Sequence, residues 1–339
     1  MARYLITGIA GFIGSTIAQE LLRRGQEVKG VDDLSTGRLQ NIQPYLNDLE
    51  FHQMDINETD RLRELCRGVD YVLHQAALAS VPRSVRDPKE SHIANIDGTL
   101  SVLLAARDAG VSRVVYAASS SAYGDQPTQP KNERMLPKPL SPYAVQKLAG
   151  EQYVKAFSHV YGLQGVCLRY FNVFGPRQSA DSPYSGVIAR FTSDMLGGKV
   201  PTIFGDGTQS RDFTFVDNVV SANLLACAAP AKEVDGNTYN IGSGRSISLC
   251  ELYAELSRLL NFKYPPLFGE PRVGDVCHSE ADLSSAMRDL NYLPIATFEK
   301  GLAATVDWYI EQTSAVVKTH KSTRAYADQL AGSQQNIST

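Results

Sequence analysis

Hydrophobic positions in the first 180 residues alternate between short apolar runs and longer stretches with helical spacing. The apolar runs predict six strands, at residues 3–7, 27–31, 49–53, 71–74, 114–118 and 166–170. The helical spacing, closed several times by glycine, predicts four helices, at residues 12–24, 57–67, 91–109 and 142–161. Because strands and helices of this length alternate, we expect parallel βαβ units with right-handed crossovers.

The rhythm changes after about residue 175, where loops rich in glycine and proline separate shorter helical stretches. This change predicts a smaller lobe that covers the carboxyl edge of the sheet, where ligands bind in open α/β folds. We therefore expect an α/β fold with a doubly wound parallel sheet at residues 1–175. A smaller α/β substrate-binding lobe is expected at 176–312, with some chain crossing back, and a polar, disordered tail at 313–339.

The composition limits the partners of the chain. Its 339 residues are 43% hydrophobic, which suits one large domain or two intimate ones. The net charge of −3 gives no electrostatic case for a nucleic acid or a membrane, so an anionic substrate must be held by a few placed cations. No apolar run approaches the ~20 residues of a membrane span. Five scattered cysteines without a C-x-x-C pair favour reduced thiols, and we expect a cytoplasmic protein without a metal site.

A glycine-rich turn joins the first predicted strand to the first predicted helix. Gly8 permits the tight turn, Gly11 lets a pyrophosphate approach the helix N-terminus, and Gly14 lets the helix pack closely on the strand. A structural turn has the same glycines, so the motif alone is weak evidence. Asp32 and Asp33 end the second strand, where a carboxylate can bind the adenosine ribose hydroxyls and repel a 2′-phosphate. The pattern therefore indicates a Rossmann-type domain that binds NAD.

Two further segments have competing interpretations. Asp55 and Ile56 follow the third strand and are placed to meet the adenine ring, although Asp55 would equally suit a helix cap. Ser119, Ser120 and Ser121 follow the fifth strand, where small hydroxyls can hydrogen-bond a sugar hydroxyl. They would also suit a turn that caps the following segment.

A tyrosine and a lysine four residues apart lie near the start of the predicted helix at 142–161. Tyr143 and Lys147 share one helix face, so the hydroxyl and the ammonium can point into one site. A nearby cation lowers the pKa of a phenol, which makes the tyrosine a proton acceptor near neutral pH. Alone the pair is commonplace on helix surfaces, but downstream of a dinucleotide turn and a serine cluster it indicates an active site.

Together these features resemble the extended short-chain dehydrogenase/reductase family over about residues 1–312. The motifs that carry the resemblance are the glycine-rich turn, Asp32, residues 74–77, 119–124, Tyr143-x-x-x-Lys147, 169–176 and 211–217. Within the family the chain is most similar to UDP-hexose 4-epimerases, especially those acting on N-acetylated sugars, on the stretches 75–84, 116–125 and 274–279. Members that dehydrate sugars carry a Thr-Asp-Glu-like run where this chain has three serines, which argues for an epimerase.

The resemblance implies a mechanism and a cofactor, NAD that stays bound through turnover. It implies that Tyr143 removes the proton of the sugar C4 hydroxyl while hydride leaves C4, that Lys147 lowers the tyrosine pKa and holds the nicotinamide ribose, and that Ser119 or, next, Ser120 bonds O4. The resulting 4-keto sugar turns its other face before hydride returns. The expected cofactor-binding residues are Gly8, Gly11, Phe12, Ile13, Gly14, Asp32, Asp33, Ser35, Thr36, Gly37, Asp55, Ile56, Gln75, Ala76, Ala77, Ala79, Asn95, Ala118, Tyr143, Lys147, Tyr170 and Val173.

The same resemblance implies that the C-terminal lobe anchors a UDP-sugar. The expected substrate-binding residues are Ser119, Ser121, Tyr143, Asn172, Gln178, Val187, Ile203, Phe204, Arg211, Arg272, Asp275 and Ser279. Arg211 and Arg272 would clamp the diphosphate, since arginine offers bidentate geometry. The small Ser279 leaves room for a 2-acetamido group where a tyrosine would fill that space, which favours UDP-GlcNAc/UDP-GalNAc over UDP-Glc/UDP-Gal. Locally, Ser279 would also suit a helix cap.

Other functions compete with this one. A 4-epimerase of a uronate such as UDP-GlcNAcA would need an extra cation in the sugar pocket, for which Arg83 and Arg177 are candidates. A dehydratase or decarboxylase shares the first half-reaction, and a dinucleotide-sensing scaffold would need neither Tyr143 nor Lys147. The resemblance also implies a homodimer that pairs through the helices at 91–109 and 142–161. Its contact residues, which could equally be core residues, would be Leu100, Val102, Leu103, Leu148 and Tyr153.

Overall fold

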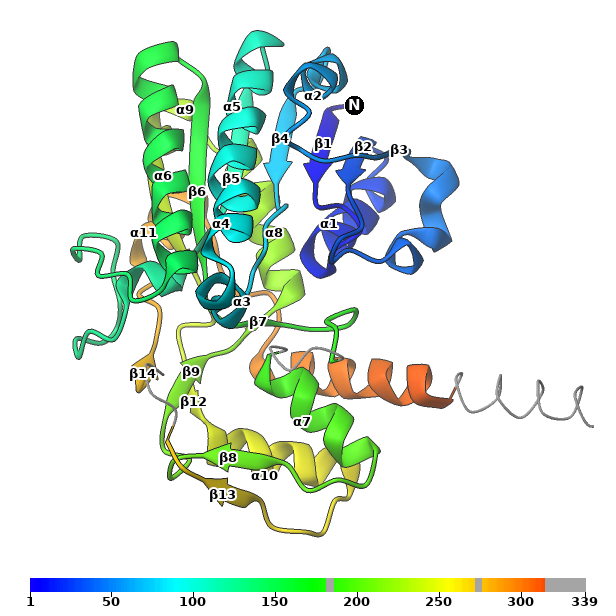
Figure 1. The fold of residues 1–339 in the computed structure, drawn as a ribbon, viewed down its shortest axis with the longest axis vertical. Coiled ribbons are helices and arrows are strands. Elements are labelled where there is room, and N and C mark those ends of the chain that lie inside the picture. Colours follow the sequence, from blue (N-terminus) through cyan, green and yellow to red (C-terminus); the bar gives the residue numbers. More distant parts are fainter. Residues whose placement is uncertain (181–185, 272–275, 315–339) are drawn as a thin grey trace, which may run out of the picture.

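The computed structural model describes residues 1–180, 186–271 and 276–314. At its centre lies a seven-stranded sheet in the order β11-β6-β5-β4-β1-β2-β3, with every neighbouring pair parallel (Figure 1). The strands are β1 (Arg3–Thr7), β2 (Glu27–Asp32), β3 (Glu50–Gln53), β4 (Tyr71–His74), β5 (Arg113–Ser119), β6 (Gln164–Tyr170) and β11 (Asn237–Ile241). The doubly wound parallel sheet predicted from the sequence is confirmed, and β11 adds a seventh strand that the chain supplies when it crosses back.

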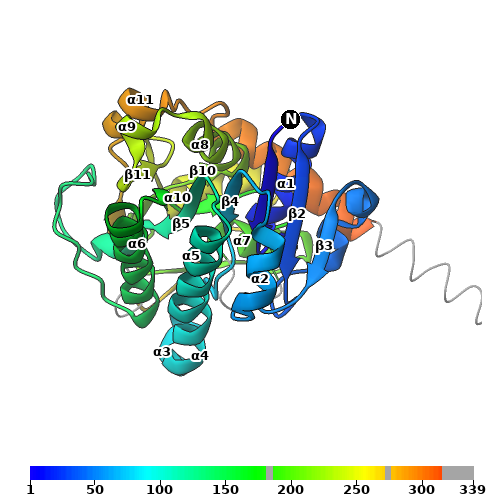
Figure 2. The same cartoon turned by 90° about the horizontal axis from the view of Figure 1, so that it is seen from above.

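Helices cover both faces of this sheet (Figure 2). One face carries α1 (Phe12–Arg23), α8 (Val216–Ala228) and α11 (Ser284–Leu290), with the short α9 (Ala231–Val234) beside β6. The other face carries α2 (Thr59–Cys66), α5 (Gly98–Asp108) and α6 (Pro142–Tyr161). The central strands are therefore buried on both sides, which explains why they read as continuous apolar runs rather than as alternating ones.

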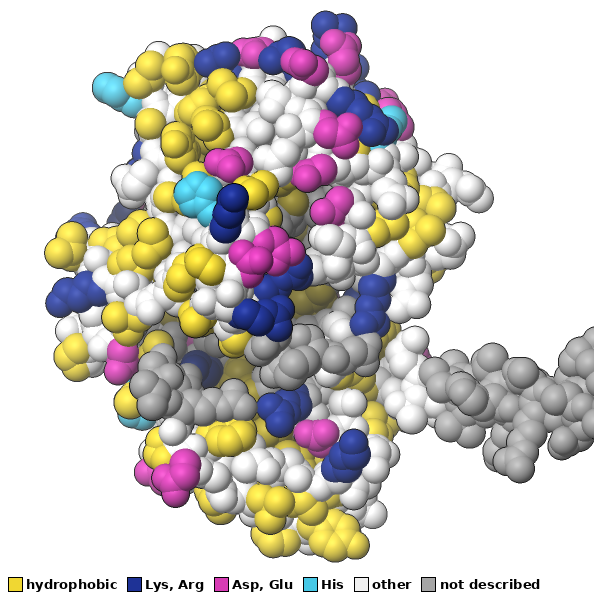
Figure 3. Space-filling model, in the orientation of Figure 1, with side chains coloured by type: hydrophobic (Ala, Val, Ile, Leu, Met, Phe, Trp, Pro, Cys, Tyr) yellow, Lys and Arg dark blue, Asp and Glu magenta, His cyan; other side chains and the backbone are white. Residues whose placement is uncertain are grey.

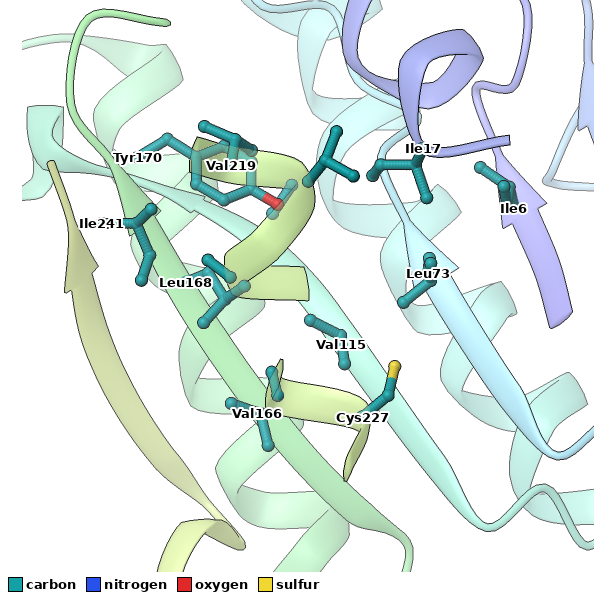
Figure 4. Close-up of a cluster of buried hydrophobic side chains, with 14 of the residues drawn as sticks. Ile6, Ile17, Leu73, Val115, Val166, Leu168, Tyr170, Val219, Cys227 and Ile241 are labelled. Atoms are coloured by element: carbon teal, nitrogen blue, oxygen red, sulfur yellow. The ribbon is translucent and has the colours of Figure 1, made fainter. Parts of the chain in front are cut away.

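Successive residues of each strand supply two separate cores. The core under α1 and α8 receives Ile6, Leu73, Val115 and Leu168 from the sheet and Val219 from α8 (Figure 4). The core under α2, α5 and α6 receives the strand neighbours of those residues, Leu5, Val72, Val114 and Cys167. All eight of these strand side chains are fully buried, so each strand holds helices against both faces.

The predicted helix at 91–109 is built differently from the expectation. The structure has α3 (Val81–Arg86), α4 (Pro88–His92), a single π-helical stretch η3 (Ile93–Asp97) and then α5. The wider π turn allows Asn95 to point inward, where it hydrogen-bonds the backbone of Leu78. Hydrophobic periodicity does not reveal such a stretch, because the apolar spacing is preserved on either side of it.

The smaller lobe lies below the carboxyl edge of the sheet (Figure 1). Two pairs of strands, β8 (Thr202–Phe204) with β13 (Leu267–Gly269) and β7 (Val173–Phe174) with β10 (Thr214–Phe215), are each parallel. A third group places β9 (Ser210–Asp212) between β12 (Ser246–Ser248) and β14 (His278–Ser279). The lobe helices are α7 (Val187–Leu196) and α10 (Leu249–Leu260).

A last helix begins at residue 298 and includes residues 313 and 314, while the rest of the expected polar tail lies outside the described residues. It packs onto the lobe core, to which it contributes Phe298, Leu302 and Val306. Within the described ranges, no helix has the length and the apolar character needed to cross a bilayer.

One buried carboxylate joins the lobe to the sheet. Asp212 of β9 is fully buried and accepts hydrogen bonds from the backbone N–H groups of Ser243 (2.6 Å), Gly244 (3.0 Å) and Ala281 (3.2 Å). It also accepts one from the Ser243 hydroxyl at 2.7 Å. Burial raises the pKa of Asp212, and these donors offset part of that effect. The segments after β11 and β14 are thereby fixed to β9.

We predict that Asp212→Ala lowers the free energy of unfolding by about 3 kcal/mol or more, because it leaves several buried N–H groups without an acceptor. Urea unfolding followed by circular dichroism measures this change. The matched control is Asp206→Ala in the same lobe, because Asp206 is exposed and its carboxylate accepts hydrogen bonds from the neighbouring Thr208. Equal stability of the two variants would contradict the role of Asp212.

Candidate active site

Polar side chains gather where the central strands end. Thr7, Asp32, His74, Ser119 and Tyr170 are the last residues of five parallel strands, so they lie along one edge of the sheet. Two cavities open at this edge. One, of about 290 Å³, lies over the glycine-rich turn and is called the sheet cavity here. The other, of about 450 Å³, lies between the sheet and the lobe and is called the lobe cavity.

The glycine-rich turn forms the floor of the sheet cavity. Gly8 has a φ of +70°, and a Cβ there would lie 2.7 Å from the backbone nitrogen of Ala76. A Cβ on Gly14 would lie 2.2 Å from the carbonyl oxygen of Gly8, so α1 can approach β1 this closely only with glycine there. The N-cap residue Gly11 has no side chain, which leaves the first N–H groups of α1 facing the cavity without a side-chain cap.

Twelve of the expected cofactor-binding residues line the sheet cavity. They are Gly8, Gly11, Asp32, Asp33, Ser35, Thr36, Gly37, Asp55, Ile56, Gln75, Ala76 and Ala77. Asp32 is buried and accepts hydrogen bonds from the N–H groups of Ala10 and Leu34, both at 2.9 Å. Asp55 is not a helix cap, since α2 has Glu58 as its N-cap, and its Oδ1 accepts from the N–H of Asn57. A glycine floor, a helix N-terminus and an acidic side wall together fit a dinucleotide.

The remaining expected cofactor residues lie elsewhere. Phe12 and Ile13 pack their side chains against the lobe core, and Ala118 is buried under α5 and α6. Ala79 is exposed, while Val173 lines the lobe cavity instead.

Asn95 is corrected, because its amide is committed to the protein. Its Oδ1 accepts from the N–H of Leu78 at 2.9 Å, and its Nδ2 donates to Gln146 on α6 at 2.9 Å. At 1% exposure it holds the loop after β4 to α6 rather than facing a ligand.

Sequence reasoning missed one wall of the sheet cavity. Arg83 of α3 and Glu90 of α4 line it together with Ile93 and Ala94. The Arg83 guanidinium makes two hydrogen bonds to Glu90, from Nε at 3.2 Å and from Nη2 at 2.6 Å. The signal available was Ser80 followed by Pro82, which marks a helix start: the Ser80 side chain caps α3. That signal locates a helix but not the cavity it borders.

The buried His74 helps to fix the loop after β4, whose backbone lies over the glycine-rich turn. The Thr99 hydroxyl donates to the carbonyl of Asn95 at 2.7 Å, so it must accept from His74 Nε2, 3.0 Å away. His74 Nδ1 then accepts from the Thr7 hydroxyl at 2.7 Å, which itself accepts from the N–H of Ala76 at 3.2 Å. Burial lowers the pKa of His74 to about 3, so the ring is neutral and this chain of donors has one direction. It positions the backbone of Ala76 over Gly8.

Tyr143 and Ser119 meet beside the sheet edge. Burial raises the pKa of Tyr143, and a side-chain hydrogen bond with Ser119 offsets part of that effect. The Ser119 hydroxyl also accepts from the N–H of Ser121 at 3.2 Å and from its hydroxyl at 2.8 Å. Ser119 therefore caps the short turn η4 (Ser120–Tyr123) and contacts the tyrosine as well, so both interpretations of the serine run apply. It is Ser119, rather than Ser120, that pairs with Tyr143.

The surroundings of Lys147 bear on the expectation that it lowers the pKa of Tyr143. The ammonium of Lys147 is buried, donates to the carbonyl of Ala117 at 2.8 Å and lies 4.9 Å from the centre of the Tyr116 ring. Burial lowers the pKa of Lys147 to about 8, and the charge of Glu151 opposes that shift. Burial thus governs both titrations, and the pKa of the phenol lies above its ordinary value.

The start of α6 is anchored by hydroxyl groups. Ser141 is its N-cap and accepts from the N–H of Ala144 at 3.2 Å. The backbone N–H of Tyr143 donates to the Ser84 hydroxyl of α3 at 3.1 Å. Because Pro82 of the same short helix lines the lobe cavity and Arg83 lines the sheet cavity, α3 connects both cavities to Tyr143.

The lobe cavity contains five of the expected substrate-binding residues. They are Asn172, Gln178, Val187, Phe204 and Arg211. Arg190, Gln209 and Phe213 also line it and were missed, since nothing local distinguishes them from surface or core residues. Arg190 and Arg211 make the cavity suitable for an anion, and α7 begins at its wall with Gly186 as an N-cap without a side chain. Figure 3 shows Lys and Arg side chains on both sides of the groove between sheet and lobe.

Ile203 is corrected, because it is fully buried in the lobe core and does not border the cavity. Ser279 is buried at 8% exposure and pairs in register with Arg211. It is not a helix cap, since α11 begins at Ser284 with Leu283 as its N-cap. Arg272 and Asp275 lie outside the described residues.

A model of the NAD dependent epimerase/dehydratase family matches residues 4–242. The chain belongs to this family. The UDP-glucose 4-epimerase of Mycolicibacterium smegmatis is 39% identical over 311 residues, which are 91% of this chain and 98% of that relative. These findings confirm the resemblance expected from the motifs. The cofactor of this chain is NAD.

Two solved structures are similar over nearly the whole chain. A UDP-N-acetylglucosamine 4-epimerase from Methanobrevibacter ruminantium, in complex with UDP-N-acetylmuramic acid, is 38% identical with a TM-score of 0.88, covering 92% of this chain and 99% of that one. A UDP-glucuronic acid 4-epimerase from Bacillus cereus, solved with NAD, is 33% identical with a TM-score of 0.85, covering 91% and 99%. These three relatives share the reaction type and differ in the sugar, whereas another similar structure is a dTDP-glucose 4,6-dehydratase from Streptomyces venezuelae.

We predict that Gly8→Ala abolishes NAD binding, because the added Cβ meets the backbone of Ala76, which cannot rotate away. The NAD content of the purified protein measures this. The matched control is Gly110→Ala, which has a φ of +72° but no atom within 4 Å of the added Cβ. It imposes the same backbone strain, about 1 kcal/mol, without the collision. Stoichiometric NAD in the Gly8 variant would contradict the cradle.

Proposed function

We propose that this epimerase inverts C4 of a UDP-hexose, with UDP-GlcNAc and UDP-GalNAc as its main substrate pair. The hydrogen bond between Ser119 and Tyr143, with Lys147 one helical turn further on, carries the proposal. It places two hydroxyl groups that can share the proton of a sugar hydroxyl at the end of β5 and the start of α6, beside the carboxyl edge of the sheet, and neither residue lines the sheet cavity or the lobe cavity. The anion-binding lobe cavity beside them supports a substrate with a diphosphate.

The residues of this chain would act as follows. NAD, when bound, supplies a hydride acceptor that later returns the hydride. Tyr143 accepts the proton of O4, with Ser119 bonded to the same oxygen, and returns the proton after the sugar has turned. Lys147, held by the carbonyl of Ala117, supplies positive charge beside the phenol and bonds the nicotinamide ribose. Arg190 and Arg211 would bind the diphosphate, while Asn172 and Phe204 would border the rest of the nucleotide.

An epimerase fits this site better than a dehydratase or decarboxylase. Loss of water needs an acid and a base near C5 and C6, and the run Ser119–Ser121 provides hydroxyl groups instead of a carboxylate. Glu151, the carboxylate nearest to Lys147 on α6, is held by Arg169 and is fully buried. A free keto sugar or carbon dioxide among the products would favour the lyase alternative.

A uronate substrate has less support. Of the two candidate cations, Arg83 is paired with Glu90 on the wall of the sheet cavity. Arg177 donates to the neutral amide of Gln19 on α1 at 2.5 Å, and its Nη1 is buried without a hydrogen-bond partner among the described residues. The charge of Arg83 is therefore paired, while Arg177 keeps the uronate alternative open. The small side chain of Ser279 supports a substrate with a 2-acetamido group.

We predict that Tyr143→Phe lowers kcat by about 10²- to 10⁴-fold, because the site loses its proton acceptor, while NAD remains bound. Epimerisation followed by proton NMR and the NAD content of the protein measure these two effects. Tyr161→Phe, near the exposed C-terminal end of the same helix, is the matched control and should retain wild-type turnover. Full activity of the Tyr143 variant would refute the assignment.

We predict that UDP-GlcNAc is turned over faster than UDP-Glc and UDP-GlcNAcA when each is incubated separately and its C4 isomers are resolved by proton NMR. Ser279→Tyr should then lower kcat/KM for UDP-GlcNAc by about 10- to 100-fold and spare UDP-Glc, because the larger side chain fills the space of the acetamido group. Preference of the wild-type enzyme for UDP-GlcNAcA would favour the uronate alternative. Equal losses on both hexoses would remove Ser279 from specificity.

We also propose a homodimer that pairs through α5 and α6. The outer face of α6 carries Val145, Tyr153 and Val160, which are 50%, 36% and 65% exposed, and hydrophobic side chains gather on this part of the surface (Figure 3). Val102 and Leu103 are corrected as contact residues, because both are buried in the core of the protomer. A single-chain mass in light scattering at micromolar concentration would contradict the dimer.

A further inference from the structure

A buried ion pair lies one helical turn beyond the lysine of the site. Tyr143, Lys147 and Glu151 are four residues apart on α6, so they share one face of the helix. Glu151 is 0% exposed and accepts two hydrogen bonds from Arg169 of β6, from Nε and Nη2, both at 2.8 Å. Arg169 is 3% exposed, and its guanidinium lies 4.7 Å from the centre of the Tyr123 ring.

Two apolar side chains of similar size could stabilise the fold about as well as this ion pair. Taking two ions out of water costs about as much as their attraction returns, and well-packed hydrophobic residues often serve as well. The third nitrogen of the guanidinium, Nη1, is buried and has no hydrogen-bond partner in the described chain. The main effect of these charges is therefore electrostatic, on the ionisable groups beside them. Lys147 is the nearest functional group on the same face of α6.

Three titratable groups on β5, β4 and α6 are neighbours of Lys147 besides Glu151. On β5, the Tyr116 ring lies 4.9 Å from its ammonium, and burial raises the pKa of Tyr116, so that phenol is neutral. On β4, His74 is neutral because burial lowers its pKa to about 3. On α6, Tyr143 is neutral for the same reason as Tyr116. Glu151 is thus the carboxylate that acts on Lys147, and its charge raises the pKa of the lysine against the effect of burial.

We propose that Glu151 and Arg169 are positioning residues that keep Lys147 protonated at neutral pH: Glu151 supplies the negative charge, and Arg169 fixes the carboxylate and limits how strongly that charge acts. The proposal rests on the proposed function of Tyr143 and Lys147. Glu151 and Arg169 are 0% and 3% exposed and bond each other, so they act through Lys147 rather than on the substrate. The ion pair of Glu151 and Arg169 would thus set the pH range of activity without contacting the reacting atoms.

Opposite substitutions give opposite predictions. Glu151→Gln removes the negative charge and leaves Arg169 unpaired, so Lys147 should lose its proton at lower pH, by about one unit or more. Arg169→Gln removes the cation that partly offsets the charge of Glu151, so Lys147 should hold its proton to higher pH. The double variant should fall between these two, and Arg169→Lys, which keeps the charge, should remain close to wild type.

Two readouts test this. The first is the titration of lysine side chains labelled with ¹³C at Cε, followed by NMR, in which the Lys147 signal is assigned by its absence in Lys147→Met. The second is the alkaline limb of kcat for epimerisation, which should move with the NMR titration in each variant. Thermal unfolding checks that each variant is folded, and the double variant, which leaves no unpaired buried charge, keeps the test available if a single variant is not.

The possible failures are distinguishable. A Lys147 titration that stays at its wild-type pH in Glu151→Gln, or that moves in the same direction in both single glutamine variants, overturns the proposal. If Lys147→Met retains the wild-type rate and pH profile, the proposed function of Lys147 fails, whatever the NMR titration shows. A purely structural pair would lower the unfolding temperature in all variants without moving the two titrations in opposite directions.

Discussion

The structure depends on the satisfaction of polar groups at the carboxyl edge of a buried parallel sheet. Strand ends there turn away from their ladders, and water cannot reach all of their N–H and C=O groups. Buried side chains accept these hydrogen bonds. Asp32 accepts from the N–H of Ala10 in the turn after β1. Thr7, which is bonded to His74, accepts from the N–H of Ala76 in the loop after β4. Asp212 does the same for the lobe. The same groups that satisfy the backbone thereby shape the two cavities.

Much of this architecture follows from short-range features of the sequence. Two buried faces make a strand continuously apolar, and a helix that must approach a strand closely needs glycine, so six strands and Gly14 could be located from the sequence alone. β11 could not, because its run Asn237–Ile241 has polar residues and joins the sheet only through pairing with β6. Ile203 was misplaced for a related reason: the alternation of β8 predicts two faces, but not which of them meets the cavity.

Side chains with two possible duties limit what a sequence can show about the site. Asn95 has the chemistry of a ligand-binding amide, yet a π turn directs it into the protein, where it joins the dinucleotide loop to α6. Arg83 has the charge expected of a substrate contact, yet Glu90, seven residues later, neutralises it. Ser119 performs two duties at once, since it caps η4 and bonds Tyr143. Partners of this kind depend on where the elements meet, which periodicity does not encode.

The raised pKa of the Tyr143 phenol changes how proton transfer must be understood. Burial opposes ionisation of the Tyr143 phenol, so a phenolate needs a positive charge nearby. Burial also lowers the pKa of the Lys147 ammonium, to about 8. Burial therefore favours the neutral form of the Tyr143 phenol. A neutral phenol holds its own proton and cannot accept that of O4, so the Tyr143 phenol must give up its proton before hydride leaves C4. The positive charge of Lys147 and, when NAD is bound, that of the oxidised nicotinamide would favour the phenolate, and burial would strengthen this attraction.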